Sequence, residues 1–159
     1  MANQTTTVPI ERLPQNQAPW THIAHIQATD VNTSTWTSAG DTIDVEFTGQ
    51  DLANEFVVLR AVPYVLTAFA GSGTLLLEVG TDGDPNNFVT STSITTAGPK
   101  VTQQGAVPAT LVGSFGSAGD DLMARITTEA ASGAPSHITA GDMKILFEIL
   151  DLDKATKGY

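Results

Sequence analysis

Three side chains with oxygen atoms, Asp82, Asp84 and Asn86, occur at alternate positions of a Gly/Asp/Asn loop. Oxygen ligands with this spacing could converge on Ca²⁺. An EF-hand loop that starts at Asp82 would need glycine at its sixth position and glutamate at its twelfth. This chain has Asn87 and Ser93 there. Asp, Gly, Pro and Asn are also the residues that turns require, so we interpret the loop as a turn, with a metal site as the weaker alternative.

The three histidines do not form a recognisable site. On a strand, His22 and His25 point to opposite faces and cannot bind one ion while the strand is regular. His137 follows Ser136 directly, but neighbours in sequence are not a nucleophile–base pair, and no serine lies in a nucleophile-elbow motif. We expect solvated or packed histidines rather than catalytic ones.

Acidic pairs and glycine-rich stretches give no stronger signal. Asp44 and Glu46 share one face of a predicted strand and could imitate the carboxylate pair of a glycosidase, but any solvated sheet face offers such a pair. The glycine-rich segments 71–77 and 113–121 lack both the lysine of a P-loop and a following helix. The sequence therefore predicts no catalytic residue, no cofactor, no metal site and a protein that is not an enzyme.

Charge and composition exclude several function classes. The net charge is −10, and the seven lysines and arginines are scattered, which argues against nucleic acid and anionic membranes as partners. No cysteine is present, which excludes disulfides and thiolate metal sites. We expect no secretory signal, because the N-terminus has neither a basic nor an apolar region. We also expect no membrane span, because no apolar run approaches about 20 residues.

The elements that carry these residues are predicted to be strands. Twenty-three threonines against four lysines favour strands over surface helices, because β-branched residues suit a pleated sheet. Residues 42–48 alternate strictly, with Ile43, Val45 and Phe47 on one face. Residues 143–150 alternate in the same way, and a short amphipathic helix is the alternative there.

The most buried hairpin is predicted between Glu55 and Phe88. Its first strand is apolar on both faces as far as Leu66, interrupted only by Arg60. Such a strand suits the inside of a sandwich or a subunit contact. Pro63 cannot donate to a ladder of hydrogen bonds, so a bulge, a break or a crossing between sheets is expected near it.

Strand signals recur every ten to fifteen residues without a convincing helix. This pattern predicts an all-β fold, an antiparallel β-sandwich that is jelly-roll-like, with a barrel as the less favoured alternative. Residues 20–159 are predicted to form this single domain. Residues 1–19 contain three prolines and no clear periodicity, so they are predicted to be an extended N-terminal arm outside any central strand. The arm is either a disordered leader or a segment that orders against a neighbouring subunit or partner.

The order of these segments resembles the small β-sandwich decoration (cement) proteins of tailed-bacteriophage heads. The resemblance rests on DTIDVEF, the apolar strand ending VLTAF, a Gly/Ser turn followed by TLLLEVGTDGDPNNFV, and the closing strand MKILFEILDL. It covers about Trp20 to Asp153. The usual loop order in such proteins is nearer Gly-Asp-Gly-Thr-Asp, whereas residues 80–84 read Gly-Thr-Asp-Gly-Asp.

The resemblance implies a role without catalytic residues. It implies a small homo-oligomer, with a trimer favoured, that binds the major capsid protein on the outer surface of the virion and stabilises the head against internal DNA pressure. Two alternatives stay open: a receptor- or carbohydrate-binding β-sandwich such as a fibre head, and, less favoured, a hydrolase or lyase. The candidate interface residues lie in the arm, at its end and in the long apolar strand: Val8, Pro9, Ile10, Trp20, Phe56, Val58, Tyr64 and Leu66.

Overall fold

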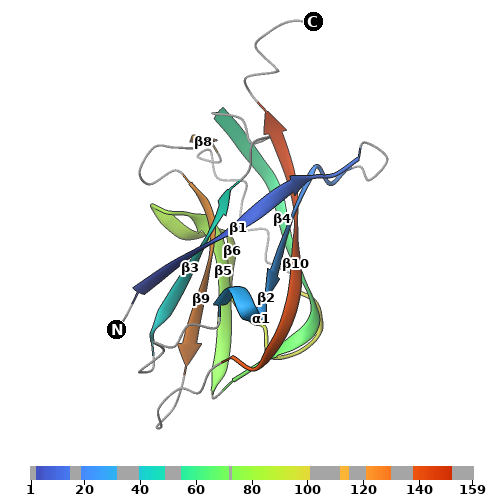
Figure 1. The fold of residues 1–159 in the computed structure, drawn as a ribbon. Helices are drawn as coiled ribbons and strands as arrows, with labels where there is room; N and C mark the ends of the chain where they lie inside the picture. Colours follow the sequence, from blue (N-terminus) through green and yellow to red (C-terminus); the bar gives the residue numbers. More distant parts are fainter. Residues whose placement is uncertain are drawn as a thin grey trace, which may run out of the picture.

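The computed structural model describes residues 3–14, 19–31, 40–48, 55–71, 73–100, 112–114, 121–129 and 138–151. These ranges contain ten strands and one short helix (Figure 1). In chain order the elements are β1 (Asn3–Arg12), β2 (His22–Gln27), α1 (Ala28–Val31), β3 (Thr42–Thr48), β4 (Glu55–Ala70), β5 (Thr74–Thr81), β6 (Asp84–Ser93), β7 (Gly98–Pro99), β8 (Val112–Ser114), β9 (Leu122–Glu129) and β10 (Ala140–Asp151).

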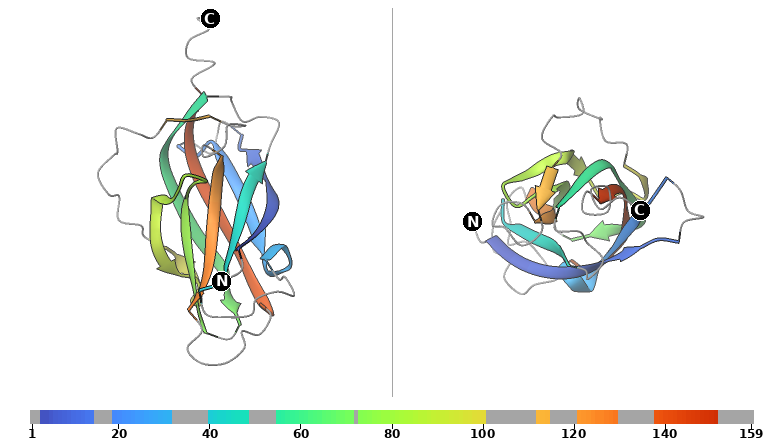
Figure 2. Two further views of the ribbon diagram at one scale, coloured as in Figure 1. Left: turned by 90° about the vertical axis from the view of Figure 1, so that its left-hand side faces the viewer. Right: turned by 90° about the horizontal axis from the view of Figure 1, so that it is seen from above.

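The strands form one mixed sheet in the order β6-β5-β9-β3-β1-β2-β10-β4-β7, with β8 beside β4. The sheet curls, so that its two halves face one another across a shared interior (Figure 2). The predicted all-β fold is confirmed, since strands dominate the described residues and α1 has only four residues. The described strand pairs are antiparallel as expected, except that β1 and β3 are parallel.

The N-terminal segment is part of this sheet. Residues 3–9 pair with β3, and residues 10–12 pair with β2. The prediction that the arm lies outside any central strand is therefore wrong for Asn3–Arg12. Pro9 is tolerated because it is the last residue paired with β3, and Ile10 is the first paired with β2. The missing N–H thus falls where the strand changes partners.

Strand β4 follows the curl of the sheet by means of bulges. Its pairing with β10 leaves Leu59 and Leu66 without an opposite residue, so the irregularity expected near Pro63 occurs on both sides of it. An extra residue changes which side chains point inward. Val58 and Ala61 are both buried, so Leu59 and Arg60 between them face outward. Leu66 faces outward because it continues the alternation with the buried Pro63 and Val65. The Pro63 carbonyl accepts a hydrogen bond from the Lys100 N–H at 2.9 Å. Because the N and C=O of one strand residue point to the same side, the missing donor of Pro63 faces away from β10.

The core lies between the two halves of the sheet. Phe47 from β3 and Phe147 from β10 meet edge to face, with ring centroids 5.6 Å apart. The hairpin predicted between Glu55 and Phe88 is wrong, because β4 pairs with β10, β7 and β8 while β5 pairs with β6 and β9. Ile94 lies between β4 and β5: its carbonyl accepts from the Phe69 N–H and its N–H donates to the Leu75 carbonyl, both at 3.0 Å. The alternation predicted for the third and last strands is confirmed by the buried residues Ile43, Val45, Phe47, Met143, Ile145, Phe147 and Ile149.

Candidate functional site: a docking face and the depression beside it

The outer surface of β2, β10 and β4 carries a row of apolar side chains. Ile23, Leu146 and Val62 lie directly opposite one another in the register of the three strands, and each is half-buried. The large apolar residues that are most exposed in the described chain, at 43–46%, lie on β4 and β10 around this row. We call this surface the docking face and define it by Ile23, Leu59, Val62, Tyr64, Leu66, Leu146 and Leu150.

Paired charges flank the apolar row. On one side of it, the Arg60 Nε donates to the Glu148 carboxylate at 2.7 Å. The same guanidinium lies 5.3 Å from the centroid of the Trp20 ring, within the range of a cation–π contact. On the other side, the His25 Nε2 lies 2.6 Å from the Asp142 carboxylate. An apolar centre with a polar rim is the usual anatomy of a protein–protein interface.

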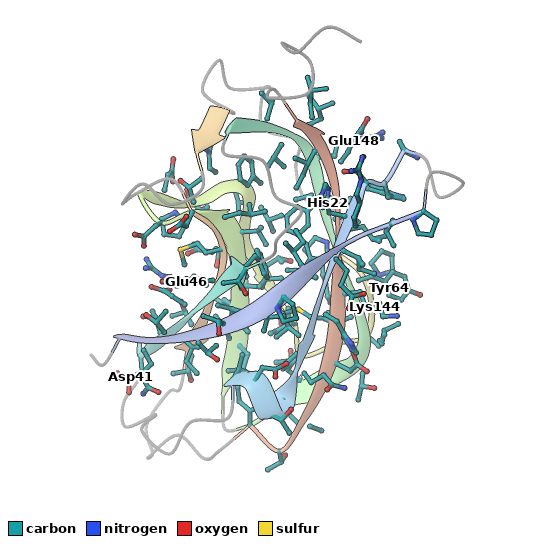
Figure 3. The ribbon with its side chains drawn as sticks, turned by 45° about the horizontal axis from the view of Figure 1, so that its top comes forward. His22, Asp41, Glu46, Tyr64, Lys144 and Glu148 are labelled. Atoms are coloured by element: carbon teal, nitrogen blue, oxygen red, sulfur yellow. The ribbon has the colours of Figure 1, made fainter. Side chains whose placement is uncertain are left out.

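The opposite side of the molecule is acidic. The outer positions of β3 and β5 carry Asp44, Glu46 and Glu78, and Arg125 on β9 lies between β3 and β5. Figure 3 shows Glu46 on the far side of the molecule from Tyr64, Lys144 and Glu148. The Asp44 carboxylate holds Arg125 by two hydrogen bonds. Among these described side chains, three carboxylates accompany one guanidinium, so negative charge exceeds positive charge on this face.

A depression of about 310 Å³ borders the docking face where β1 separates from β2. The register that pairs Glu11 with Ile23 would next pair Pro9 with His25. Pro9 has no N–H to donate to the His25 carbonyl, so the ladder stops and the strands diverge. The lining residues are Val8, Pro9, Glu11, Ile23, His25, Gln27, Asp30 and Lys144.

The predicted interface residues fall into two groups. Pro9, Tyr64 and Leu66 are exposed, and Trp20 is half-buried beneath Arg60. The prediction was wrong for three others, because Val8 is 3%, Ile10 5% and Val58 1% exposed and all belong to the core. The side chain of Phe56 lies outside the described residues.

Sequence reasoning missed Ile23, Leu59, Val62, Leu146 and Leu150 as interface candidates. A signal for two of them was present, since Leu146 and Leu150 alternate with the core residues of the last strand and must face outward when those face inward. Leu59 gave no such signal, because its direction depends on a bulge that the sequence does not reveal.

The residues considered for chemistry are dispersed. His22 is buried and His25 is exposed, as expected for opposite strand faces. Asp82 and Asp84 are exposed. The turn interpretation is confirmed for Asp82 and Gly83, but Asp84 and Asn86 belong to strand β6. Within the ranges that the structure describes, no three His, Cys, Asp or Glu side chains are grouped so as to hold a metal ion. Ser136 and His137 lie outside these ranges.

Comparisons with known proteins do not assign the chain to a family. No family model matches the chain, and neither the curated proteins nor the solved structures include a match. No helix in the described part of the chain is long and apolar enough to cross a membrane.

Proposed function

We propose that this chain is a non-catalytic structural protein of a bacteriophage virion, a decoration protein that binds the outer capsid surface and stabilises the head. The docking face binds the major capsid protein, and the protein acts as a small homo-oligomer, with a trimer favoured. In this proposal the fold is a jelly-roll-like sandwich, whose two layers are the halves of the curled sheet.

The observation that carries the proposal is the contrast between the two faces. The docking face presents a continuous apolar row across three strands, flanked by the ion pairs Arg60–Glu148 and His25–Asp142, with Lys144 beside the row in none of the ion pairs of the described residues. Burying such a surface against a protein removes apolar area from water without leaving those paired charges uncompensated. The acidic face, with Glu46 and Glu78, would then point to solvent and keep particles dispersed by like-charge repulsion.

The test begins with purified virions of the phage that encodes the chain. Mass spectrometry should find the protein in them, and particles that lack it should lose their DNA at a lower temperature. Added wild-type protein should co-sediment with those particles and restore their stability. The double variant Leu66→Asp/Leu146→Ser should fold but fail to bind. Thr90→Asp adds a charge at an exposed position of β6 that does not line the depression, and it should still bind. Absence of the protein from virions, or full binding by the double variant, would contradict the proposal.

A receptor- or carbohydrate-binding module is the second candidate. Tyr64 favours it, because an exposed aromatic ring on the outer face of a sheet can stack on a sugar. One face of the Trp20 ring is already covered by Arg60, and the residue directly opposite Tyr64 is Lys144 rather than an Asp or Asn. This composition suits a protein surface better than a sugar. Glycan-array binding that is lost in Tyr64→Ala and kept in Leu146→Ser would favour the second candidate.

A further inference from the structure

We propose that the depression between β1 and β2 receives a protruding segment of the partner protein that carries one acidic and one basic side chain. This inference rests on the proposed function in one respect only, since it takes the neighbouring docking face as the surface that meets the partner. The depression would give the docking face specificity for one partner, which an apolar row alone does not provide. Charges placed around an apolar contact determine which partner binds and in which register.

Two opposite charges at the depression are left for a ligand. Glu11 lies opposite Ile23 on the neighbouring strand, and Lys144 lies opposite His25. Both line the depression. None of the ion pairs among the described residues includes Glu11 or Lys144. A carboxylate and an ammonium group therefore border one hollow without neutralising each other.

The other charged groups that face the depression are already engaged. The His25 imidazole lies 2.6 Å from the Asp142 carboxylate. The Asp30 carboxylate accepts a hydrogen bond from the Gln27 backbone N–H at 2.7 Å. Both interactions are internal to the chain, so they shape the walls of the depression and leave Glu11 and Lys144 as its available charges.

The apolar part of the lining explains why these charges can select a partner. Val8, Pro9 and Ile23 contribute aliphatic surface, and Ile23 belongs to the docking face as well. A segment that enters the depression displaces water from this surface, and a charge interaction strengthens as the surrounding water is excluded. A like charge brought to Glu11 or Lys144 would be repelled, which discriminates against other partners.

The depression can be probed without the partner. We would titrate the isotopically labelled full chain with four blocked tripeptides, Lys-Gly-Asp, Asp-Gly-Lys, Asp-Gly-Asp and Lys-Gly-Lys, at concentrations on the order of 10 mM, where weak millimolar binding is detectable. We expect the two mixed tripeptides to shift the amide signals of Ile23, His25 and Lys144 at several-fold lower concentration than the like-charged ones. Equal effects of all four, or no shift at these residues, would overturn the inference.

Charge reversal gives the second measurement. Lys144→Glu should change the preference to Lys-Gly-Lys, and Glu11→Lys should change it to Asp-Gly-Asp. Lys144→Met keeps the aliphatic stem and should simply lose the preference for the mixed peptides, which separates recognition from misfolding. Unchanged preferences in folded variants would also overturn the inference.

The inference and the proposed function can fail separately. Capsid binding that survives both Glu11→Lys and Lys144→Glu, yet is lost in Leu66→Asp/Leu146→Ser, would remove the inference and keep the docking face. Peptide selectivity in a protein that is absent from virions would remove the proposed function and keep the depression as a recognition site for another protein.

Discussion

Arg125 and Asp44 lie directly opposite each other on β9 and β3, and the guanidinium donates from Nε and Nη2 to the two carboxylate oxygens at 2.6 and 2.8 Å. The Asp44 side chain is only 7% exposed and that of Arg125 26%. The hydrogen bond to Asp44 is the main reason that the pKa of Arg125 is raised, and the charges of Asp44, Glu78 and Asp82 act in the same direction against partial burial. The Arg125–Asp44 ion pair holds the Asp44 carboxylate in place and offsets its repulsion from neighbouring carboxylates on the same face.

Replacing Arg125 with glutamine should destabilise the fold by about 2–3 kcal/mol, because it leaves a nearly buried carboxylate without its charged donor. Arg60→Gln is the matched control. The Arg60–Glu148 pair is more exposed, at 40% and 23%, and should contribute at most about 1 kcal/mol. Urea denaturation of both variants checks this. Equal losses would mean that burial does not determine the strength of these pairs.

The contribution of Arg125 should not depend on pH in the physiological range. Its pKa is raised in the folded state, so the stabilisation is complete below the unfolded pKa and disappears only as pH rises through the folded one. The difference in unfolding free energy between the wild type and Arg125→Gln should therefore stay constant from about pH 7 to about pH 10. A steady decline over this range would show that another group controls the pair.

Gly141 packs its backbone against the ring of Phe69. A Cβ at this position would overlap the ring, and the φ of 154° also disfavours a side chain. Gly141→Ala should cost about 1–3 kcal/mol through overpacking, and Phe69→Leu should recover part of this cost in the double variant. Gly98→Ala is the control, because φ is 115° there but no atom lies within 4 Å of the added Cβ. A double-mutant cycle by thermal denaturation measures the coupling, and additive effects would exclude the contact as the cause.

Val58 and Leu66 occupy the same strand but should respond differently to aspartate. Val58 is 1% exposed, so Val58→Asp would bury a charge and should prevent folding. Leu66 is 45% exposed, so Leu66→Asp should change the unfolding free energy by less than about 0.5 kcal/mol while it weakens assembly or partner binding. Circular dichroism and sedimentation distinguish the two outcomes. A Leu66→Asp protein that assembles like wild type would show that this part of the docking face is not an interface.

Pro9→Thr should extend the β1–β2 ladder and narrow the depression. The new N–H can donate to the His25 carbonyl, which Pro9 cannot do. The hydrogen bond contributes about 0.5–1.5 kcal/mol and the looser unfolded chain costs a similar amount, so stability should change little. Hydrogen exchange should instead show a protected amide at residue 9. Rapid exchange there would mean that another feature separates the strands.

The local pattern of the sequence was sufficient to predict which segments form strands and which of their side chains point into the core. Strict alternation placed Ile43, Val45 and Phe47 in the core, because a strand directs successive side chains to opposite sides wherever it lies in the sheet. The same alternation in β10 implied an outward Leu146 and Leu150. The turn at Asp82 followed from its residue types, since turn chemistry is local.

The local pattern did not predict which strands are neighbours in the sheet or where the bulges occur. The prolines of the N-terminal segment suggested an arm, but β1 is a central strand because Pro9 falls where its partner changes from β3 to β2. The apolar run of β4 suggested two buried faces, whereas Leu59, Tyr64 and Leu66 are exposed on its outer face, Leu59 next to a bulge. The sequence by itself determined which segments are strands and which residues alternate inward. Only the tertiary structure decided which strands pair, because pairing depends on the register between segments that are far apart in the chain. That pairing places Ile23, Leu146 and Val62 in one row. It also brings Glu11 and Lys144 to the same depression.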